Sequence, residues 1–531
     1  MKVKNVGSKK QLFIDEAFFA STHNVKLTMN PPRKTDERTI YPDKPWELLV
    51  GEYDSIIKVG DEYRCYYTAL MEIPKGKEVK FFGNPWDHEF VCCTCLAVSK
   101  DGIDWEKPNL GLIEYGGTRN TNIIFPPKIL WNETCMVFID TKPGIPDDEK
   151  FKATVAWAGP KGQHDGGIWV LKSADGIRFV PMTDEPVYNN SDTDNRAFWD
   201  ERINKYVIYF RDNSDHYVKD TIYQEVQHGN RREILTNKAG RTAPDHESGV
   251  LYRDYAFRKV RRCEVDDLRE KWSYEKSQVV AQADSQEAPG TDYNANSTQK
   301  YPWADDVYLM FPGLMRHLYH PPYGLDDLDQ SDPISYNDAV QEIRLMTSRD
   351  GINFKYISRQ PFIPRGVRGN YDSGYVTVPA VGMIRDGANL YLYSGNKNHN
   401  VRHGAVPLKA YRENPAFISR LVMRLDGFVS VDTDNAGGEF TTVPMTFQGS
   451  ALELNHDCFV AGYLIVELLK DGKPIEGFTF KDCDLIEDNY IDKTVTWNGN
   501  SDVSALQGQP VQLRFVMRNT KLYAFQFVNS L

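Results

Sequence analysis

The amino-acid sequence predicts an all-β protein, a five-bladed β-propeller at residues 1–430 followed by a C-terminal β-sandwich at residues 431–531. Three observations lead to this prediction. A short Asp-Gly turn recurs along the chain, strand-like runs precede each copy, and the pattern stops after Phe428. The 29 Tyr and 26 Phe also favour strands.

The recurring turn is Ser-x-Asp-Gly-Ile-x-aromatic. Complete copies lie at residues 99–105, 173–179 and 348–354, and degraded copies surround Asp267 and Asp426. The aspartates at 101, 175, 267, 350 and 426 are 74, 92, 83 and 76 residues apart. A near-constant period of this length is typical of a repeat architecture.

Each copy predicts one antiparallel unit. Asp-Gly favours a tight turn because Gly accepts a positive φ and Asp caps its own turn. The strand-like runs before the turns are residues 63–67, 151–155, 206–210, 307–311 and 390–393. We expect about four strands per unit, with the turn between the third and fourth strands, and such units repeat radially in a propeller. The alternative is an array of unrelated sandwiches with coincident turns.

The last 100 residues lack the repeat. The runs at residues 463–467 and 511–517 are strand-like, and the second alternates apolar and polar residues, as expected of a strand with one buried face. No Pro/Ser-rich linker precedes them, so we expect this module to pack directly on the propeller. Its expected role is to stabilise or oligomerise the protein, with Trp497 as a possible sugar platform.

Composition excludes several classes of protein. Of the 531 residues, 41% are hydrophobic and 26% charged, as in a packed protein rather than a disordered one. The net charge of −11 argues against nucleic acid as a partner. The lack of any 18-residue apolar run argues against a membrane-spanning helix, and the N-terminal decapeptide lacks the apolar stretch of a secretory signal. We therefore expect a cytoplasmic protein.

Eight cysteines are present, and three of them form the cluster Cys92-Cys93-Thr94-Cys95. The spacing differs from the C-x2-C pair of zinc sites, and no matching Cys or His pair follows. The apolar run around the cluster favours small buried strand residues, with a metal or redox role as the alternative. We predict no metal and no cofactor, and the free thiols fit a reducing compartment.

The Asp-Gly turns resemble those of the β-fructosidase-like and arabinosidase-like glycoside hydrolases of families 32, 43, 62 and 68. Residues 105–112 and 120–124 are similar to uncharacterised bacterial proteins of the family-32-like branch. The resemblance covers essentially the whole chain and implies glycoside hydrolysis in a central funnel. The motifs W-x-N-D-P-N-G, R-D-P and E-C are absent, so the resemblance does not extend to sucrose or fructan cleavage.

Glycoside hydrolysis needs two carboxyl groups, one protonated and one ionised. In a propeller the innermost strands converge, so we expect these groups where inner strands begin. The candidate catalytic residues are Glu47, Asp194, Asp292 and Asp372. Glu52 and Asp54 compete with Glu47, and a turn or surface role is the alternative for each candidate.

The candidate substrate-binding residues are side chains near the same strand starts that can stack on a sugar or bind its hydroxyls. They are Trp46, Asn122, Arg196, Tyr293, Tyr371 and His399. Tyr and Trp present a flat apolar face and a polar edge. Arginine can also bind an anionic group.

The sequence thus predicts a glycoside hydrolase that acts on a small oligosaccharide or glycoside, with a homo-oligomer as an option for its assembly. Two alternatives remain open at this stage. A glycoside phosphorylase would use one carboxyl acid and hold phosphate with an Arg/His cluster. A non-catalytic carbohydrate-binding protein would keep the propeller and lack the acid.

Overall fold

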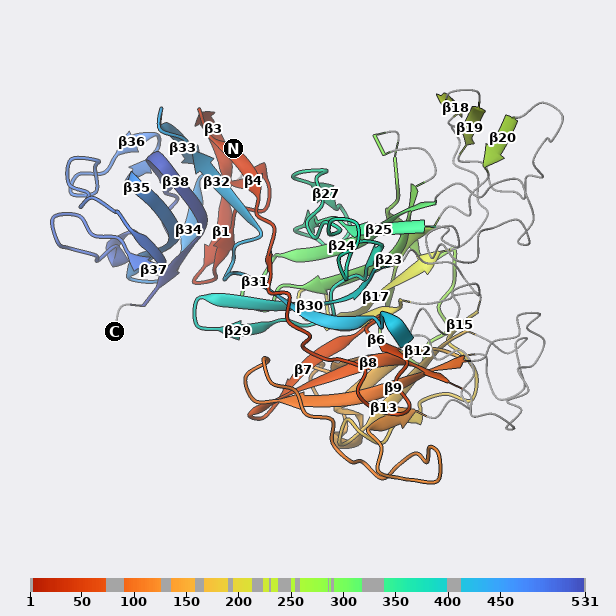
Figure 1. Cartoon of the computed structure of the whole chain (residues 1–531). Coiled ribbons are helices and arrows are strands. Elements are labelled where there is room, and N and C mark those ends of the chain that lie inside the picture. The colour runs from red at the N-terminus through yellow and green to blue at the C-terminus, as the bar shows by residue number, and fades with distance from the viewer. Residues whose placement is uncertain are drawn as a thin grey trace.

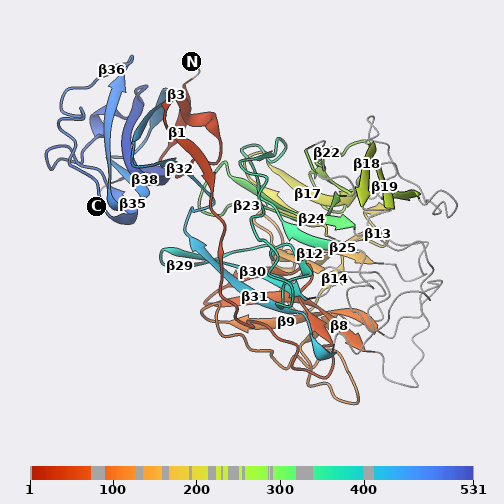
Figure 2. The same ribbon diagram turned by 45° about the horizontal axis from the view of Figure 1, so that its top comes forward.

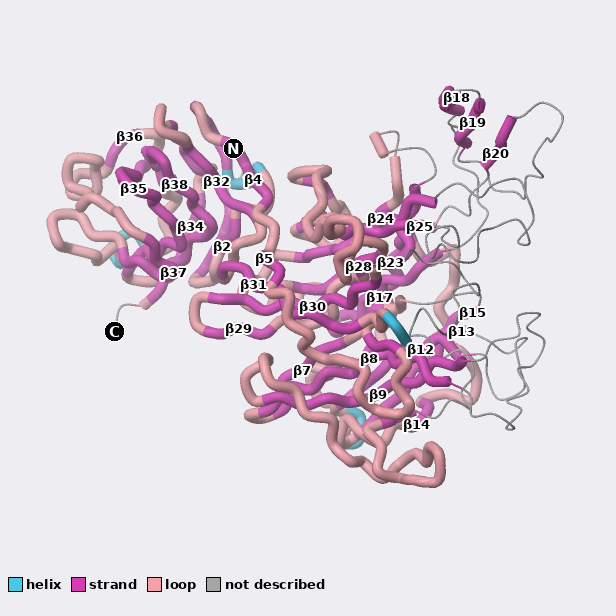
Figure 3. Tube along the Cα trace, in the orientation of Figure 1, coloured by secondary structure: helices cyan, strands magenta, loops and turns pink. Residues whose placement is uncertain are grey.

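The computed structural model describes residues 3–72, 90–125, 135–157, 167–189, 194–212, 223–228, 231–236, 250–253, 258–284, 286–287, 291–317, 339–398 and 412–529. Strands dominate these residues, and the 3-10 helices are single turns at Glu16–Phe18, Asp147–Glu149 and Ser504–Leu506 (Figure 3). The predicted all-β class is confirmed. In the part of the chain so described, no helix has the length and apolar character needed to cross a membrane.

Five antiparallel units follow one another along the chain. The strands of units one and two are β6 (Leu49–Val50), β7 (Ser55–Val59), β8 (Glu62–Glu72), β9 (Phe90–Ser99), β10 (Ile123–Phe125), β11 (Cys135–Ile139), β12 (Phe151–Trp157), β13 (Gly167–Ser173), β14 (Val180–Pro181) and β15 (Tyr188–Asn189). Those of unit three are β16 (Arg196–Asp200), β17 (Lys205–Asp212), β21 (Lys259–Val265) and β22 (Gln278–Ala281).

Units four and five belong to one ten-stranded sheet, in which β25 pairs with β28. Their strands are β23 (Thr291–Lys300), β24 (Tyr308–His317), β25 (Ala339–Ile343), β26 (Met346–Ser348), β27 (Lys355–Tyr356), β28 (Tyr375–Val376), β29 (Ile384–Asp386), β30 (Asn389–Lys397), β31 (Phe417–Arg424) and β5 (Arg33–Lys34). A separate three-stranded sheet contains β18 (Tyr223–His228), β19 (Arg231–Thr236) and β20 (Val250–Arg253).

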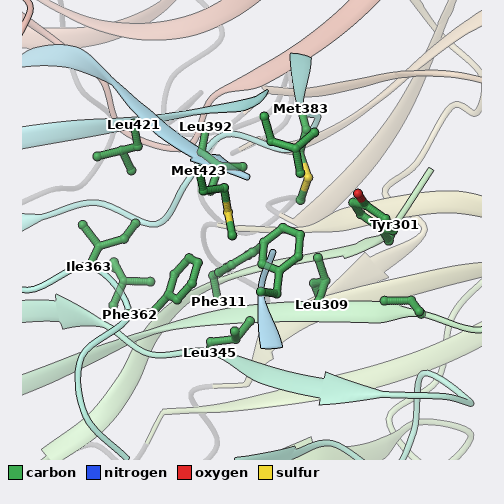
Figure 4. Packing of buried hydrophobic residues seen from close by; sticks show 14 of the residues in the cluster. Tyr301, Leu309, Phe311, Leu345, Phe362, Ile363, Met383, Leu392, Leu421 and Met423 are labelled. Carbon is green, nitrogen blue, oxygen red and sulfur yellow. The ribbon is translucent and has the colours of Figure 1, made fainter. Parts of the chain in front are cut away.

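The hydrophobic cores show how the units are arranged. Each of five buried clusters joins two neighbouring units, including unit five to unit one. Taken in order, the paired residues are Tyr66 and Val137, Val170 and Tyr206, Tyr209 and Met310, Phe311 and Leu392, and Tyr393 and Tyr67. Figure 4 shows the cluster between units four and five. The packing therefore closes the units into a ring, and the predicted propeller-type fold is confirmed.

The ring is completed by the N-terminal part of the chain. The short strand β5 pairs with β31 and supplies the edge strand of unit five, although it precedes that unit by more than 300 residues in sequence. Ser55 of unit one forms a β-bridge with Val381 of unit five. Closure therefore depends on contacts between distant segments, which cover the edges that open sheets leave exposed.

The three complete Asp-Gly turns adopt the same geometry. In the first turn, Ser99 Oγ accepts the N–H of Gly102 at 2.8 Å, and Asp101 Oδ1 accepts the N–H groups of Ile103 and Asp104 at 2.8 and 3.0 Å. Gly102 has a φ of +76°, in the region that favours glycine. The turn therefore satisfies its own backbone donors with its own side chains.

A tyrosine of the preceding unit reaches each complete turn. The hydroxyl groups of Tyr393, Tyr66 and Tyr209 donate to the carbonyl oxygens of Gly102, Gly176 and Gly351 at 2.6, 2.9 and 2.6 Å. These three turns are therefore more than hairpin turns, because each also links its unit to the preceding one.

The second part of the molecule is a β-rich unit built from both ends of the chain (Figures 1 and 2). Its strands are β1 (Lys4–Gly7), β2 (Gln11–Leu12), β3 (Phe19–His23), β4 (Lys26–Met29), β32 (Val429–Thr433), β33 (Gly438–Thr442), β34 (Met445–Phe447), β35 (Ala451–Lys470), β36 (Lys473–Pro474), β37 (Asn489–Thr494) and β38 (Gln512–Val528). The long strands β35 and β38 pair along most of their length. A sandwich arrangement of these strands stays a prediction.

The strand pairing differs from the predicted boundaries at the N-terminus. We assigned residues 1–430 to the propeller, but β1 pairs with β34, β2 with β38, β3 with β33 and β4 with β32. The first strands therefore belong to the C-terminal unit. Alternation along a strand predicts which face is buried but not which distant strand is its partner, so the sequence pattern could not reveal this exchange.

Candidate active site

The edge of the ring where inner strands begin carries polar residues from several units. Each inner strand pairs antiparallel with the second strand of its unit, as β16 does with β17 and β23 with β24. A residue that precedes an inner strand therefore lies beside one that ends the second strand. Charged residues occupy both kinds of position, including Asp54, Asp194, Arg211 and Lys397.

Arg196, the first residue of β16, lies where the units meet. Its Nη2 is 2.7 Å from Asp194 Oδ1, its Nη1 donates to the carbonyl oxygen of Asp54 at 3.3 Å, and its Nε donates to the carbonyl oxygen of Asn296 at 3.1 Å. The guanidinium also contacts Met136 Sδ. Arg196 thus joins units one, two, three and four. We call Asp54, Asp194 and Arg196 the central cluster.

Asp54 is the carboxyl group of unit one in this cluster. The N–H of Thr68 donates to its Oδ1 at 3.3 Å, and the N–H of Val381 in unit five donates to its carbonyl oxygen at 3.0 Å. Burial raises the pKa of Asp54 to about 7, against the opposing effects of the Thr68 N–H and the Arg196 charge. The carboxyl group can therefore give up and regain a proton near neutral pH.

Asp194 is the second buried carboxyl group. Its backbone adopts a φ of +73°, unusual for a residue other than glycine, and its Oδ2 accepts the N–H of Asn296. Burial raises its pKa, and the charge of Arg196 is the largest opposing effect. Because arginine stays protonated at accessible pH, Asp194 always faces a positive charge.

A hydrogen-bonded chain runs across units three, four and five, and its first member, Arg211, acts electrostatically on Asp194. Arg211 Nη1 donates to the carbonyl oxygen and to Oδ1 of Asn294 at 2.7 and 3.3 Å. Asn294 Nδ2 donates to Gln341 Oε1 at 3.0 Å and to the Tyr375 hydroxyl at 2.7 Å. These contacts fix the amide and hydroxyl groups in one orientation.

Lys397, the last residue of β30, is a buried amine in the same region. Its ammonium group contacts Glu52 Oε1 and lies 5.3 Å from the centroid of the Tyr375 ring. Burial lowers the pKa of Lys397 to about 7. The Glu52 side chain is 27% exposed, so this ion pair lies between the buried residues and solvent.

Asp292 and Tyr293 occupy adjacent positions at the start of β23 and point to opposite faces of the strand. The Asp292 carboxylate is buried and contacts Arg258 Nη1 at 3.4 Å. The Tyr293 hydroxyl lies 2.5 Å from that of Tyr356, in the core between units three and four. The structure thus places Asp292 among the charged groups and Tyr293 in the hydrophobic packing.

Glu47, Trp46 and Asn122 belong to a separate network within unit one. Glu47 accepts the Tyr67 hydroxyl at 2.6 Å and lies 2.5 Å from Lys107 Nζ. Trp46 Nε1 donates to Asn122 Oδ1 at 2.9 Å, and Asn122 Nδ2 donates to the Tyr67 hydroxyl at 2.7 Å. All these groups come from one unit, and this network has a clear structural role.

The candidates of unit five also lie apart from the central cluster. Asp372 forms an ion pair with Lys34 on β5, the strand at the edge of that unit. The Tyr371 hydroxyl donates to Asp36 Oδ1 at 2.6 Å. His399 lies outside the residues that the structure describes.

The structure thus brings together Asp194 and Arg196 from our candidates and adds Asp54. Asp292 lies on the same strand as Asn296, which bonds to Asp194 and Arg196, but four residues earlier and beside Arg258. From the sequence, Asp54 is predicted only as a competitor of Glu47. Arg211 and Lys397 lie near the ends of β17 and β30 and are not among the candidates; a charged residue near the end of a long strand-like run was the available signal.

The described residues contain no group of three or more His, Cys, Asp or Glu side chains arranged to hold a metal ion. The cysteines among them are free, and Cys93 and Cys95 lie buried on β9 with their sulfurs 3.8 Å apart.

No protein-family model matches the chain, and no curated protein sequence matches it. In structure it is similar to a thermostable family-43 glycoside hydrolase, with 13% identity over 74% of this chain and 96% of that one and a TM-score of 0.40. It is also similar to the β-1,2-mannobiose phosphorylase of Listeria innocua, with 10% identity over 75% and 97% of the two chains and a TM-score of 0.42. An N-acetylgalactosamine deacetylase from F. plautii shares 12% identity over 76% and 96%, with a TM-score of 0.42.

Proposed function

We propose that the protein is a glycoside hydrolase that cleaves a small oligosaccharide or glycoside at the central cluster. The observation that carries the proposal is a pair of buried aspartates, Asp54, whose pKa is raised to about 7, and Asp194. Arg196 contacts the carboxyl group of Asp194 and the backbone carbonyl oxygen of Asp54. Glycoside hydrolysis needs two carboxyl groups, one that exchanges a proton and one that is ionised.

Asp54 is the proton-exchanging group in this proposal. Near neutral pH it donates a proton to the departing glycosidic oxygen. A water molecule then adds to the anomeric carbon, and Asp54 takes up the proton that this water releases. Asp194 is the second carboxyl group, and its ionised form, paired with Arg196, stabilises the positive charge that develops on the sugar ring. Asp292 is the third carboxylate, and it orients substrate hydroxyls beside Arg258.

A substrate screen with variants tests the proposal. Aryl-glycosides and plant and bacterial oligosaccharides are offered to the wild type and to Asp54→Asn and Asp194→Asn. We expect turnover of at least one glycoside and a loss of about 100-fold or more in kcat for each variant. Glu47→Gln is the matched control, because that carboxylate lies in the separate network of unit one. Unchanged turnover in both aspartate variants would refute the assignment.

A phosphorylase is the second candidate, and one observation favours it. Arg211, Arg258 and Lys397 place cationic side chains beside the carboxyl groups, and such groups bind phosphate well. A phosphorylase would release a sugar phosphate and would need inorganic phosphate for turnover. Phosphate-independent turnover that releases a free reducing sugar would exclude it.

A further inference from the structure

A crevice of about 410 Å³ lies where the C-terminal unit meets the propeller. Its walls come from the N-terminal segment 8–10, from Gln526 of β38, from Glu201 and from the segment 300–305 that follows β23. This volume is within the range of about 300–1,000 Å³ that ligand sites usually have. The crevice is thus large enough for a small ligand.

Contacts beside the crevice hold its two walls in a fixed relation. Arg349, in the third Asp-Gly turn, lies 2.9 Å from both Asp15 Oδ1 and Asp306 Oδ2, and its Nη2 donates to the carbonyl oxygen of Leu12 at 2.8 Å. The arginine therefore links the propeller to the N-terminal strands. The crevice is preformed, so a ligand would not have to order it.

The charged groups around the crevice are balanced in sign. Lys9 Nζ lies 2.7 Å from Asp305 Oδ1, Lys10 Nζ lies 2.8 Å from Asp426 Oδ2, and Lys300 pairs with Glu201. Paired charges produce little net field to attract an anion. They do present ammonium donors next to carboxylate acceptors, and a hydroxyl group can use both at once.

An aromatic residue contributes the apolar part of the lining. Trp303 is half-buried, and its ring packs edge-to-face with Tyr301 at a centroid distance of 5.2 Å. The Tyr301 hydroxyl donates to Asp426 Oδ1 at 2.7 Å, and its ring lies in the core shown in Figure 4. Tyr301 therefore holds the indole in place.

We propose that this crevice is a second binding site, for a neutral saccharide unit. A sugar ring has an apolar C–H face that packs on an indole and a rim of hydroxyl groups that need both donors and acceptors. Trp303 supplies the first contact, and the pairs of Lys9, Lys10 and Lys300 supply the second. The site stands whether or not the centre hydrolyses glycosides.

The central cluster contacts the middle of β23, and the crevice lies at the end of the same strand. Asp194 and Arg196 both bond to Asn296, and β23 ends at Lys300, four residues later in sequence. At a rise of about 3.3 Å per residue, about 13 Å of strand separates the two sites. A saccharide in the crevice would thus anchor a longer chain or a glycan surface without entering the central site.

Native electrophoresis of the full-length protein through gels cast with a polysaccharide tests the proposal. The probes are four neutral polymers, mannan, arabinan, xylan and galactan, with polygalacturonate as the anionic comparison. We expect at least one neutral polymer to retard the wild type. Trp303→Ala should raise the dissociation constant about tenfold, because it removes the aromatic contact.

Two further variants cover the case in which Trp303→Ala fails to fold. The double variant Lys9→Ala/Gln526→Ala changes residues that are not buried, and it should raise the dissociation constant about threefold, which corresponds to the loss of one or two modest hydrogen bonds. Lys473→Ala, at an exposed position on β36, should leave the mobility unchanged.

Asp54→Asn separates this site from the central one. It should abolish turnover if the proposed function is right and keep the retardation in the gel. The second site is refuted if none of the four neutral polymers retards the wild type, or if Asp54→Asn abolishes retardation. The proposal would also be refuted if Trp303→Ala were retarded as strongly as the wild type, or if polygalacturonate were the only polymer that retarded the wild type.

Discussion

Aspartates of the outer turns and of the centre are held in opposite ways. Asp101 accepts N–H groups from Ile103 and Asp104 of its own turn, and these bonds lower its pKa. Asp54 is buried, with the N–H of Thr68 at its carboxyl group and Arg196 of unit three nearby, and burial raises its pKa to about 7. The turn thus supplies its carboxylate with hydrogen bonds from neighbouring residues. The centre buries a carboxyl group and raises its pKa, and perturbed pKa values of this kind are common at functional sites.

The arginines show the same contrast. Arg178 pairs with Asp175 within its own turn at 2.9 Å, and 68% of its side chain is exposed. Arg196 is fully buried and contacts groups of four units. The outer arginine could be lost with little effect, but the inner one holds the ring of units together at its centre.

Replacement of Arg196 should produce the largest effect on stability. Arg196→Met leaves Asp194 buried without its counter-ion, so we expect a loss of about 3–5 kcal/mol in the free energy of unfolding. Arg178→Met is the matched control at an outer turn and should change this free energy by less than about 1 kcal/mol. Urea titration measures both free energies. Equal losses would show that the buried arginine contributes no more to stability than the exposed one.

The pH dependence of stability should show the raised pKa of Asp54. Its pKa is raised from 3.8 to about 7, so the folded protein binds more protons than the unfolded chain between these values. Stability should therefore fall as pH rises through this window, by up to about 4 kcal/mol from this group. Asp54→Asn should remove that part of the slope. Urea titrations from pH 4 to 8 compare the two proteins, and identical profiles would show that the pKa is not raised.

Glu47→Gln should lower the stability of the protein without lowering its activity. The change breaks the buried ion pair with Lys107, so we expect a loss of about 2–3 kcal/mol in the free energy of unfolding. The kcat on any substrate found should stay near the wild-type value. A large drop in kcat, with Asp54→Asn still active, would move the catalytic site to unit one.

Gly102→Ala tests the link between units. A Cβ at Gly102 would lie 2.6 Å from the Tyr393 hydroxyl, in a backbone region that disfavours alanine. We expect a loss of about 2 kcal/mol. Gly111 also has a positive φ but has nothing within 4 Å of its position for a Cβ, so Gly111→Ala should cost only about 1 kcal/mol. Thermal unfolding compares them, and equal shifts would mean that the contact with Tyr393 contributes nothing.

Asp101→Ala should have the smallest effect. It removes three hydrogen bonds of an exposed turn that water can replace, so we expect a loss of about 1 kcal/mol. Thermal unfolding of the full-length protein measures this change. A loss larger than that of Gly102→Ala would show that the local bonds matter more than the contact between units.

The sequence predicted the repeating part of the fold because the repeat is local. The Asp-Gly turns and the strands before them use residues close to one another in sequence. The hydrogen bonds that Ser99 and Asp101 accept from the backbone of the same turn form its geometry. The C-terminal unit was predicted less well. Its strands β1–β4 come from the other end of the chain, and strand alternation does not specify a partner.

The central cluster could be predicted only in part for the same reason. Asp194 and Arg196 were predicted because they precede or begin an inner strand, but Glu47 occupies a similar position in sequence and lies in a separate network. Arg211 and Lys397 lie near the ends of β17 and β30, and only the antiparallel pairing brings them to this edge. Sequence position alone did not distinguish the residues of the central cluster from Glu47.

The sequence by itself determined the strands and the turns of the repeat, because hydrogen bonds and side-chain alternation within each unit are set by neighbouring residues. The tertiary structure decided which carboxyl groups share the centre and which are held by lysines elsewhere. That outcome depends on how five separate units pack, and the pKa of Asp54 follows from the burial that this packing creates.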